Sequence, residues 1–191
     1  MGLLFLGDLF YDYEYIKKDI LEFAEYVKRN NYSVILNLEG SITDSSNAEI
    51  RKRGEHLCQS KNVTDVLNLL NVKGVVLSNN HIYDYLEKGV EDTIETLKKY
   101  NIPYTGIVNS KRDIPKSILI QDGNEEYEIF AATDPFEESI CRTDKKGCCL
   151  IEDLMNDDLF VSNKTKKIAY LHTGFEYNTL PTKRTIDECR K

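Results

Sequence analysis

Short apolar runs alternate with segments of helical periodicity along the first hundred residues. The runs with the length of buried strands are 3–6, 34–36 and 75–77. Apolar residues at spacings of three and four predict helices over 16–27, 63–70 and 90–97. Asp12 is a candidate N-cap for the first of these helices. The recurring order of strand, loop and helix indicates an α/β fold.

The pattern changes in the second half of the chain. Residues 118–120 and 127–130 predict two strands, and the turn 122–124 between them predicts a β-hairpin. The run 168–171 predicts a last strand, while 134–165 predicts only a short helix. The final ten residues have the composition of a helix start. Since no repeat or linker interrupts the chain, we expect one domain over 1–191 whose strands are not all parallel.

Charge and hydropathy exclude two classes of partner. The 191 residues include 25 Lys and Arg and 32 Asp and Glu, a formal net charge of −7 with no basic stripe, which argues against nucleic acid. Every apolar run is far shorter than the ~20 residues that cross a bilayer, so we expect no membrane segment. The five cysteines form no C-x-x-C pair, which indicates free thiols and a cytoplasmic location.

Oxygen and imidazole donors follow the predicted strands, at the edge where open α/β sheets form their sites. These donors are Asp8, Asn37, Glu39, Asn79, Asn80, His81, His172 and Glu176. Carboxylate, amide oxygen and imidazole are ligands for Mn, Fe, Zn or Mg. A bound metal ion lowers the pKa of its water to about 7, and two ions can hold both reacting oxygens. The sequence therefore predicts a hydrolytic site with one or two divalent ions.

Each donor also has a structural explanation when it is taken alone. Asp8 fits a turn or a helix cap, and the pair Asn79 and Asn80 fits a turn. His81 and His172 each fit a hydrogen-bonded, half-buried histidine. Their joint occurrence at four strand ends favours a shared site.

Two features of the 41–61 loop bear on the predicted site. The basic residues 51–53 are either a solvated patch or an anchor for an anionic substrate. His56 in the same loop is expected on the surface. Because this loop is long, substrate specificity is expected to lie there and in 134–165.

Four motifs in order resemble the CapA-type proteins of bacterial poly-γ-glutamate capsule biosynthesis, a branch of the calcineurin-like metallophosphoesterases. The motif residues are Gly7, Asp8, Asn37, Leu38, Glu39, Gly40, Asn79, Asn80, His81, Asp84, Gly89, His172, Gly174, Glu176, Tyr177 and Pro181. The resemblance extends from residue 5 to about residue 186. It implies a four-layer α/β/β/α sandwich with two mixed sheets, the calcineurin-like metallophosphatase fold.

The resemblance also implies a role for each donor. Asp8 would bind the first metal ion, and Glu39 would take the place of the bridging carboxylate. Asn80 and His172 would bind the second ion. His81 would be the uncoordinated imidazole that protonates the leaving group. In addition, Glu176 and Asn37 would bind metal or substrate.

The sequence departs from the family pattern at three places. Phe10 stands where metallophosphoesterases usually have a histidine, so the first ion loses a ligand. Leu86 stands where a glycine is usual. A Gly-His-x-x-His segment expected after the helix near Pro181 is absent, which predicts a chain truncated at its C-terminus. Because Met1 falls directly before the first strand, we expect the variety without an N-terminal membrane segment.

Two functions therefore remain open at this point. The first is a metal-dependent hydrolase of the calcineurin-like phosphoesterase class, acting on an anionic small molecule or polymer linked to the capsule or the cell envelope. The alternative is a non-catalytic accessory or binding protein of a polyglutamate synthesis or export complex.

Overall fold

The computed structural model describes residues 2–52, 54–110, 113–135, 146–161, 165–174 and 178–190. In the first half, the strands are β1 (Gly2–Leu9), β2 (Tyr32–Leu38), β3 (Ser41–Ile42), β4 (Cys58–Gln59), β5 (Val72–Val76) and β6 (Tyr104–Thr105). The helices of this half are α1 (Lys18–Arg29), α2 (Val63–Leu69) and α3 (Leu86–Lys99). The predicted strands and helices of this half are all confirmed in kind, with boundaries that differ by a few residues.

The second half contains the predicted hairpin and a further parallel strand. Its strands are β7 (Ile107–Val108), β8 (Ile118–Asp122), β9 (Glu125–Thr133), β10 (Gly147–Cys148) and β11 (Lys166–His172). Its helices are α4 (Ile151–Met155), α5 (Asp158–Val161) and α6 (Lys183–Glu188). The strands β8 and β9 pair antiparallel, as the turn predicted.

Two sheets form the centre of the molecule. The first has the order β1-β2-β5-β6 and is parallel throughout, while the second has the order β11-β9-β8. Only the second is mixed, because β9 pairs parallel with β11 and antiparallel with β8. The prediction of two mixed sheets is thus wrong for the first one. Its strands are joined by helical crossovers, which connect parallel neighbours, whereas the tight hairpin of β8 and β9 lies in the second sheet.

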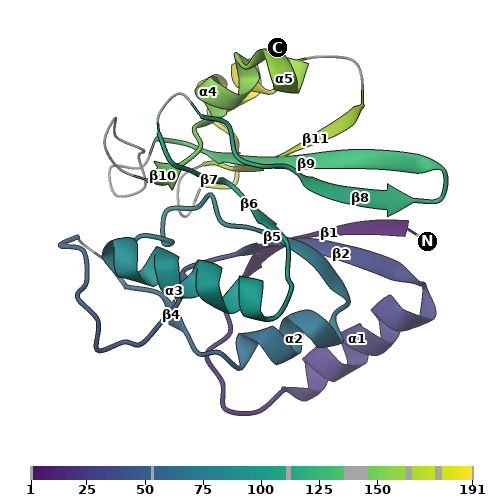
Figure 1. Ribbon diagram of the computed structural model, residues 1–191, viewed down its shortest axis with the longest axis vertical. Helices are drawn as coiled ribbons and strands as arrows, with labels where there is room; N and C mark the ends of the chain where they lie inside the picture. The colour runs from purple at the N-terminus through teal and green to yellow at the C-terminus, as the bar shows by residue number, and fades with distance from the viewer. Residues whose placement is uncertain are drawn as a thin grey trace.

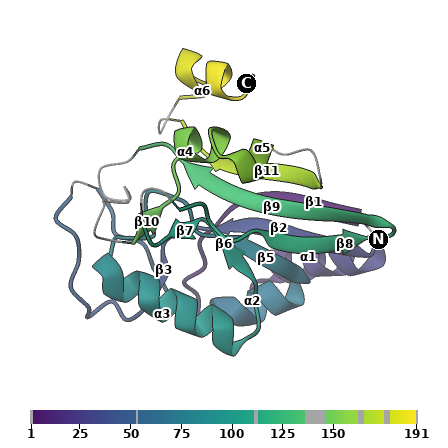
Figure 2. The same cartoon turned by 45° about the horizontal axis from the view of Figure 1, so that its top comes forward.

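The two sheets pack face to face with helices outside them. Figure 1 shows α1, α2 and α3 below the first sheet, the second sheet above it, and α4 and α5 above that. Figure 2 shows β9 and β11 on the same side of β1 and β2 from a second direction. The α/β class with more than one sheet is confirmed. The complete four-layer sandwich stays a prediction, since α4 and α5 have only five and four residues.

Alternating side chains on the central strands hold these layers together. Leu36 of β2 packs with the helices, whereas its neighbour Ile35 packs between the sheets with Ile129 of β9. Phe130 of β9 faces the other way, toward α4 and α5. This alternation follows from the period of two along a strand. Each fully buried side chain of this kind stabilises the fold by roughly 1.5–3 kcal/mol.

The start of α1 corrects one sequence prediction. Asp12 does not cap this helix, because the N-cap is Lys17 and the helix begins at Lys18. The side chain of Tyr11 is buried, and its hydroxyl donates to the carbonyl of Tyr15 and accepts from the backbone N–H of Lys17. These two bonds fix a compact loop over 11–17, so the helix starts later than the polar pattern indicated.

None of the helices within the described ranges has both the length and the apolar character needed to cross a bilayer.

Candidate metal centre

Asp8 and Asn37 are brought together by the pairing of β1 with β2. Their Cα atoms are register partners near the carboxyl ends of the two parallel strands. The register shifts between Phe5 and Asp8, an irregularity of the kind that re-aims side chains at strand ends. The amide Nδ2 of Asn37 donates to Oδ1 of Asp8 over 2.7 Å. Asn37 is fully buried, so it holds the half-exposed Asp8 carboxylate in place.

Glu39 enters the same cluster through the turn that follows β2. The next residue, Gly40, has φ of +81°, and a Cβ on it would lie 2.7 Å from Cβ of Leu57. Only glycine fits this turn, which directs the chain away directly after Glu39. The backbone N–H of Glu39 donates to the carbonyl of Leu9 over 3.0 Å. This bond ties the turn to the end of β1.

His172 completes the cluster from the second sheet. Ligand atoms of Asp8, Glu39 and His172 all lie within 4.8 Å of one another. Ligands on opposite sides of one ion with bonds of about 2.1 Å are roughly 4 Å apart. Two carboxylates and one imidazole at this spacing fit a divalent cation of the Mn, Fe, Zn or Mg class. The donor set therefore passes the chemical test for a metal site.

Asn80 reaches the other side of the same imidazole. Oδ1 of Asn80 lies 2.9 Å from Nε2 of His172, while Oδ1 of Asp8 lies 3.5 Å from Nδ1. Neighbouring ligands of one ion with bonds of about 2.1 Å are separated by about 3 Å, so Asn80 and His172 can share an ion through Nε2. The carboxylate on Nδ1 would then orient the ring, as carboxylates commonly do for metal-binding histidines.

Asn79 connects this cluster to His81. Its amide Nδ2 donates to Oδ1 of Asn37 over 3.1 Å and to the carbonyl of Leu38 over 3.0 Å. Its own Oδ1 accepts from the backbone N–H of His81 over 3.0 Å. Asn79 is fully buried. The position of His81 is therefore fixed through the backbone to the same strand ends that hold the donors.

The electrostatics of the cluster favour an ionised Asp8. The interaction with His172 lowers the pKa of Asp8, burial opposes this effect, and the hydrogen bond from Asn37 together with the two imidazoles keeps the pKa below its ordinary value. Tyr170 lies nearby, and burial together with the charge of Asp8 raises its pKa to about 12. Asp8 is thus a carboxylate near neutral pH, which is the form that binds a cation.

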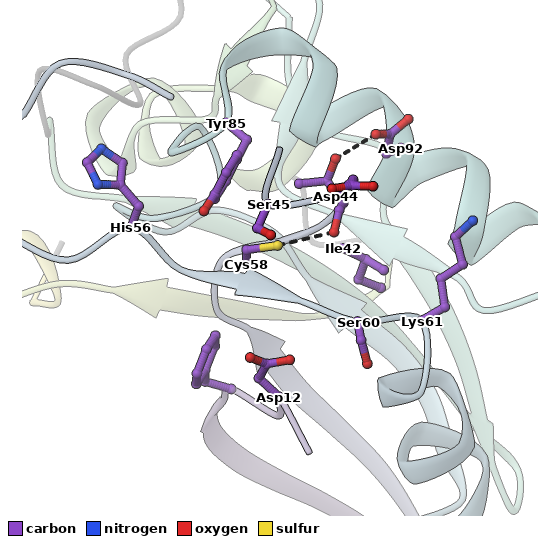
Figure 3. A pocket seen from close by; sticks show the side chains of 12 residues that line it. Asp12, Ile42, Asp44, Ser45, His56, Cys58, Ser60, Lys61, Tyr85 and Asp92 are labelled. Atoms are coloured by element: carbon purple, nitrogen blue, oxygen red, sulfur yellow. Dashed lines mark hydrogen bonds between the residues drawn. The ribbon is translucent and has the colours of Figure 1, made fainter. Parts of the chain in front are cut away.

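A separate pocket of about 640 Å³ is lined by none of the cluster residues (Figure 3). Most of its lining comes from the 41–61 loop, together with Phe10, Asp12, Tyr85 and Asp92. Figure 3 shows Asp12 on one side of it and Tyr85 and Asp44 on the other.

The structure thus brings together Asp8, Asn37, Glu39, Asn80 and His172, with His81 connected to them through Asn79. Glu176 lies outside the described residues. Phe10 lines the pocket, with 41% of its surface exposed. His56 lines the pocket with 19% of its side chain exposed, and its Nε2 lies 2.7 Å from the carbonyl oxygen of Ile50.

Three residues have roles that the sequence analysis did not assign. Asp84 is fully buried and its Oδ2 lies 2.8 Å from Nδ1 of His81. Lys52 forms an ion pair with the same carboxylate. Asp134, directly after β9, accepts from the hydroxyl of Thr173 and from the backbone N–H of Gly174. Two features of the sequence could have indicated these roles. Asp84 follows His81 by three residues, and Asp134 is an acidic residue directly after β9.

These features define an α/β protein with a carboxylate, amide and imidazole cluster at the ends of its strands. The chain belongs to the bacterial capsule synthesis protein family PGA_cap, whose sequence profile matches residues 3–191. It is 25% identical over 175 residues to the capsule biosynthesis protein CapA of Bacillus anthracis. That match covers 84% of this chain and 41% of the relative, so the chain spans less than half the length of that protein. The predicted CapA-type resemblance is confirmed.

Proposed function

We propose that this chain is a metal-dependent hydrolase of the calcineurin-like phosphoesterase class that acts in the synthesis of a capsule or another cell-envelope polymer. The observation that supports this most directly is the approach of Asp8, Glu39 and His172 to within 4.8 Å. The family supports the capsule-related role. The proposed substrate is an anionic small molecule or polymer, such as a phosphoester or a poly-γ-glutamate segment, handled alone or within a capsule synthesis complex.

The proposed roles follow from the positions of the side chains. Asp8, Glu39, Asn80 and His172 would hold one or two divalent ions, with Asn37 orienting Asp8. A bound ion would supply a water of lowered pKa and charge stabilisation for the reacting oxygens. His81 would act as a doubly protonated imidazolium, donating the proton on its Nε2 to the leaving group while its Nδ1–H stays bonded to Asp84.

We also propose that the chain has the complete four-layer calcineurin-like sandwich and that it is located in the cytoplasm. The order of helices, sheet, sheet and short helices supports the fold assignment. Cell fractionation of the native host tests the location.

Metal analysis of the purified chain tests the proposed function. Protein incubated with Mn²⁺ and freed of excess metal should retain at least one ion per chain, and should hydrolyse bis-p-nitrophenyl phosphate. Asp8→Ala should lose both properties. Asp12→Ala removes an exposed carboxylate from the loop after the same strand and should keep both. Equal metal content in wild type and Asp8→Ala would remove the metal assignment.

Phe10 favours the second candidate, a non-catalytic accessory or binding protein. It is an apolar residue at a position where metallophosphoesterases usually have a ligand, and it lines the pocket. An accessory protein would copurify with an amide ligase and a membrane partner without any phosphodiesterase turnover. Turnover that disappears in Asp8→Ala would argue against this candidate.

A further inference from the structure

The long loop between β3 and β4 sends a lysine into the interior beside His81. The side chain of Lys52 is only 9% exposed, and it forms an ion pair with the fully buried Asp84. Its Nζ also lies 3.2 Å from Nδ1 of His81. Its neighbour Arg51 is exposed, so adjacent basic residues have different surroundings and Lys52 is the buried cation of the two.

Asp84 is the centre of this network. Its Oδ2 lies 2.8 Å from Nδ1 of His81 and accepts from the backbone N–H of Leu57 over 2.8 Å. Its backbone carbonyl accepts from the N–H of Ile50 over 2.8 Å. The carboxylate of Asp84 can only accept from Nδ1 of His81 and the ammonium of Lys52 can only donate to it. The carboxylate is the closer of the two, at 2.8 Å against 3.2 Å, so the arrangement favours a proton on Nδ1. The other ring nitrogen, Nε2, faces away from the network.

Lys52 pairs with the oxygen of Asp84 that does not face the histidine. Its ammonium group occupies Oδ1, and this leaves Oδ2 for His81 and Leu57. A buried ion pair of this kind adds little net stability, because the desolvation of both charges offsets their attraction. Its effect is geometric, since it prevents the carboxylate from rotating away from the imidazole.

We propose that Lys52 and Asp84 are positioning residues that fix the tautomer and orientation of His81, with Lys52 acting through Asp84. Because Lys52 and Leu57 both bond to Asp84, the 50–57 loop helps to hold the proposed acid His81 in position. This inference rests on the proposed function for the catalytic role of His81, but the arrangement of protons does not depend on any activity.

A pair of substitutions separates positioning from simple stabilisation. In Asp84→Asn, an amide oxygen turned toward His81 would place the amide NH₂ against the ammonium of Lys52. An amide turned the other way places its NH₂ against Nδ1, which must then accept and lose its proton, and it also loses the hydrogen bond from the N–H of Leu57. Because the ammonium of Lys52 carries a full charge, we expect this second orientation. In Lys52→Met/Asp84→Asn the clash with the ammonium is gone, so the amide oxygen can face His81 again.

Nitrogen-15 NMR of histidine-labelled protein at pH 8 reads the tautomer directly. The chain has three histidines, so single His→Gln variants assign the signals. We expect Nδ1–H in the wild type, Nε2–H in Asp84→Asn, and Nδ1–H again in the double variant. Lys61→Met removes a lysine that lines the pocket and should leave the His81 signals unchanged. Nδ1–H in both folded Asp84 variants would overturn the proposal, and so would failure of the folded double variant to recover the wild-type signal.

Turnover of bis-p-nitrophenyl phosphate with Mn²⁺ gives a second readout. kcat should fall by about 10²–10⁴-fold in Asp84→Asn, because a ring whose Nδ1 accepts from the amide cannot carry protons on both nitrogens and so cannot act as the imidazolium acid. It should recover substantially in the double variant at unchanged KM. A raised KM in Lys52→Met with an unchanged tautomer would instead make Lys52 a substrate anchor, which overturns the proposal. A wild type without turnover removes the hydrolase function, while the NMR series still decides the positioning role.

Discussion

The molecule contains two carboxylate–imidazole pairs in different surroundings. In the pair Asp8 and His172 the closest oxygen and nitrogen are 3.5 Å apart and the side chains are 49% and 16% exposed. In the pair Asp84 and His81 the distance is 2.8 Å and the exposed fractions are 0% and 12%. The first pair is open and loosely bonded, so its carboxylate remains available to a cation. The second pair is closed and satisfied internally, so it can orient a ring but cannot bind an ion in addition.

The largest expected effect follows from removing the histidine of the second pair. His81→Ala should lower the turnover of a phosphodiester by about 10²–10⁴-fold. Metal content should stay unchanged, because the donors of the first pair are intact. The unfolding free energy should fall by only about 1 kcal/mol, since Leu57 and Lys52 still bond Asp84. Steady-state kinetics, elemental analysis and urea unfolding measure the three quantities; an early-melting variant with full specific activity would refute the catalytic assignment.

Replacing the carboxylate of each pair by alanine should lower the unfolding free energy by different amounts. Asp84→Ala leaves Lys52 buried without its counter-charge, so we expect a loss of about 3–5 kcal/mol in the unfolding free energy. Asp8→Ala removes a half-exposed and loosely paired group, so its loss should stay below about 1 kcal/mol. Urea denaturation of both variants in metal-free buffer makes the comparison. Equal losses would mean that the two pairs do not differ in the way their burial indicates.

The pH dependence of the unfolding free energy should show how strongly the buried Asp84 is stabilised in its ionised form. Burial alone would raise the pKa of Asp84, but the hydrogen bonds from His81, Lys52 and Leu57 outweigh it and hold the pKa below its ordinary value. The stabilisation is therefore complete above the unfolded pKa of about 3.9 and is lost as the pH falls through the folded pKa. Unfolding free energies between pH 6 and pH 3 should show this loss in the wild type. Lys52→Met/Asp84→Asn should show a shallower decrease, and equal slopes would contradict the prediction.

The smallest effect concerns the turn that joins the second pair to α3. Leu86 has φ of +54°, a left-handed conformation that costs an ordinary residue about 1–2 kcal/mol. Leu86→Gly removes this cost but adds roughly 0.5–1 kcal/mol of chain entropy, so the unfolding free energy should change by less than about 1 kcal/mol. Glu87→Gly, in the first turn of the helix proper, should be destabilising by about 1 kcal/mol. Thermal melts of both variants test the difference, and a larger loss in Leu86→Gly would contradict it.

The order of strands and helices was predictable because each element repeats its apolar residues at its own period. The period of the β8–β9 hairpin and the apolar face of α3 are local features, and both predictions are confirmed. The N-cap of α1 was not predictable in this way. It depends on the hydroxyl of Tyr11 bonding to residues 15 and 17, and that geometry exists only when Tyr11 is buried.

The candidate site also has one part that was predictable from the sequence and one part that was not. Donors at strand ends were visible in the sequence, because parallel strands in one sheet bring their carboxyl ends to one edge. The pairing of Asp8 with Asn37 and the approach of Glu39 follow from that rule. The ion pair of Lys52 with Asp84 does not follow from that rule. The two residues are 32 positions apart, and nothing in a basic loop segment indicates which side chain will be buried.

The sequence by itself determined the class of fold, the edge of the sheet that carries polar donors, and the family. Each of these depends on local periodicity, on motif order or on a rule that holds for every open parallel sheet. Only the tertiary structure decided which carboxylate is open and which is closed. That distinction depends on how the 41–61 loop folds back over His81 and Asp84, and a loop without periodicity takes its path from the surfaces against which it packs.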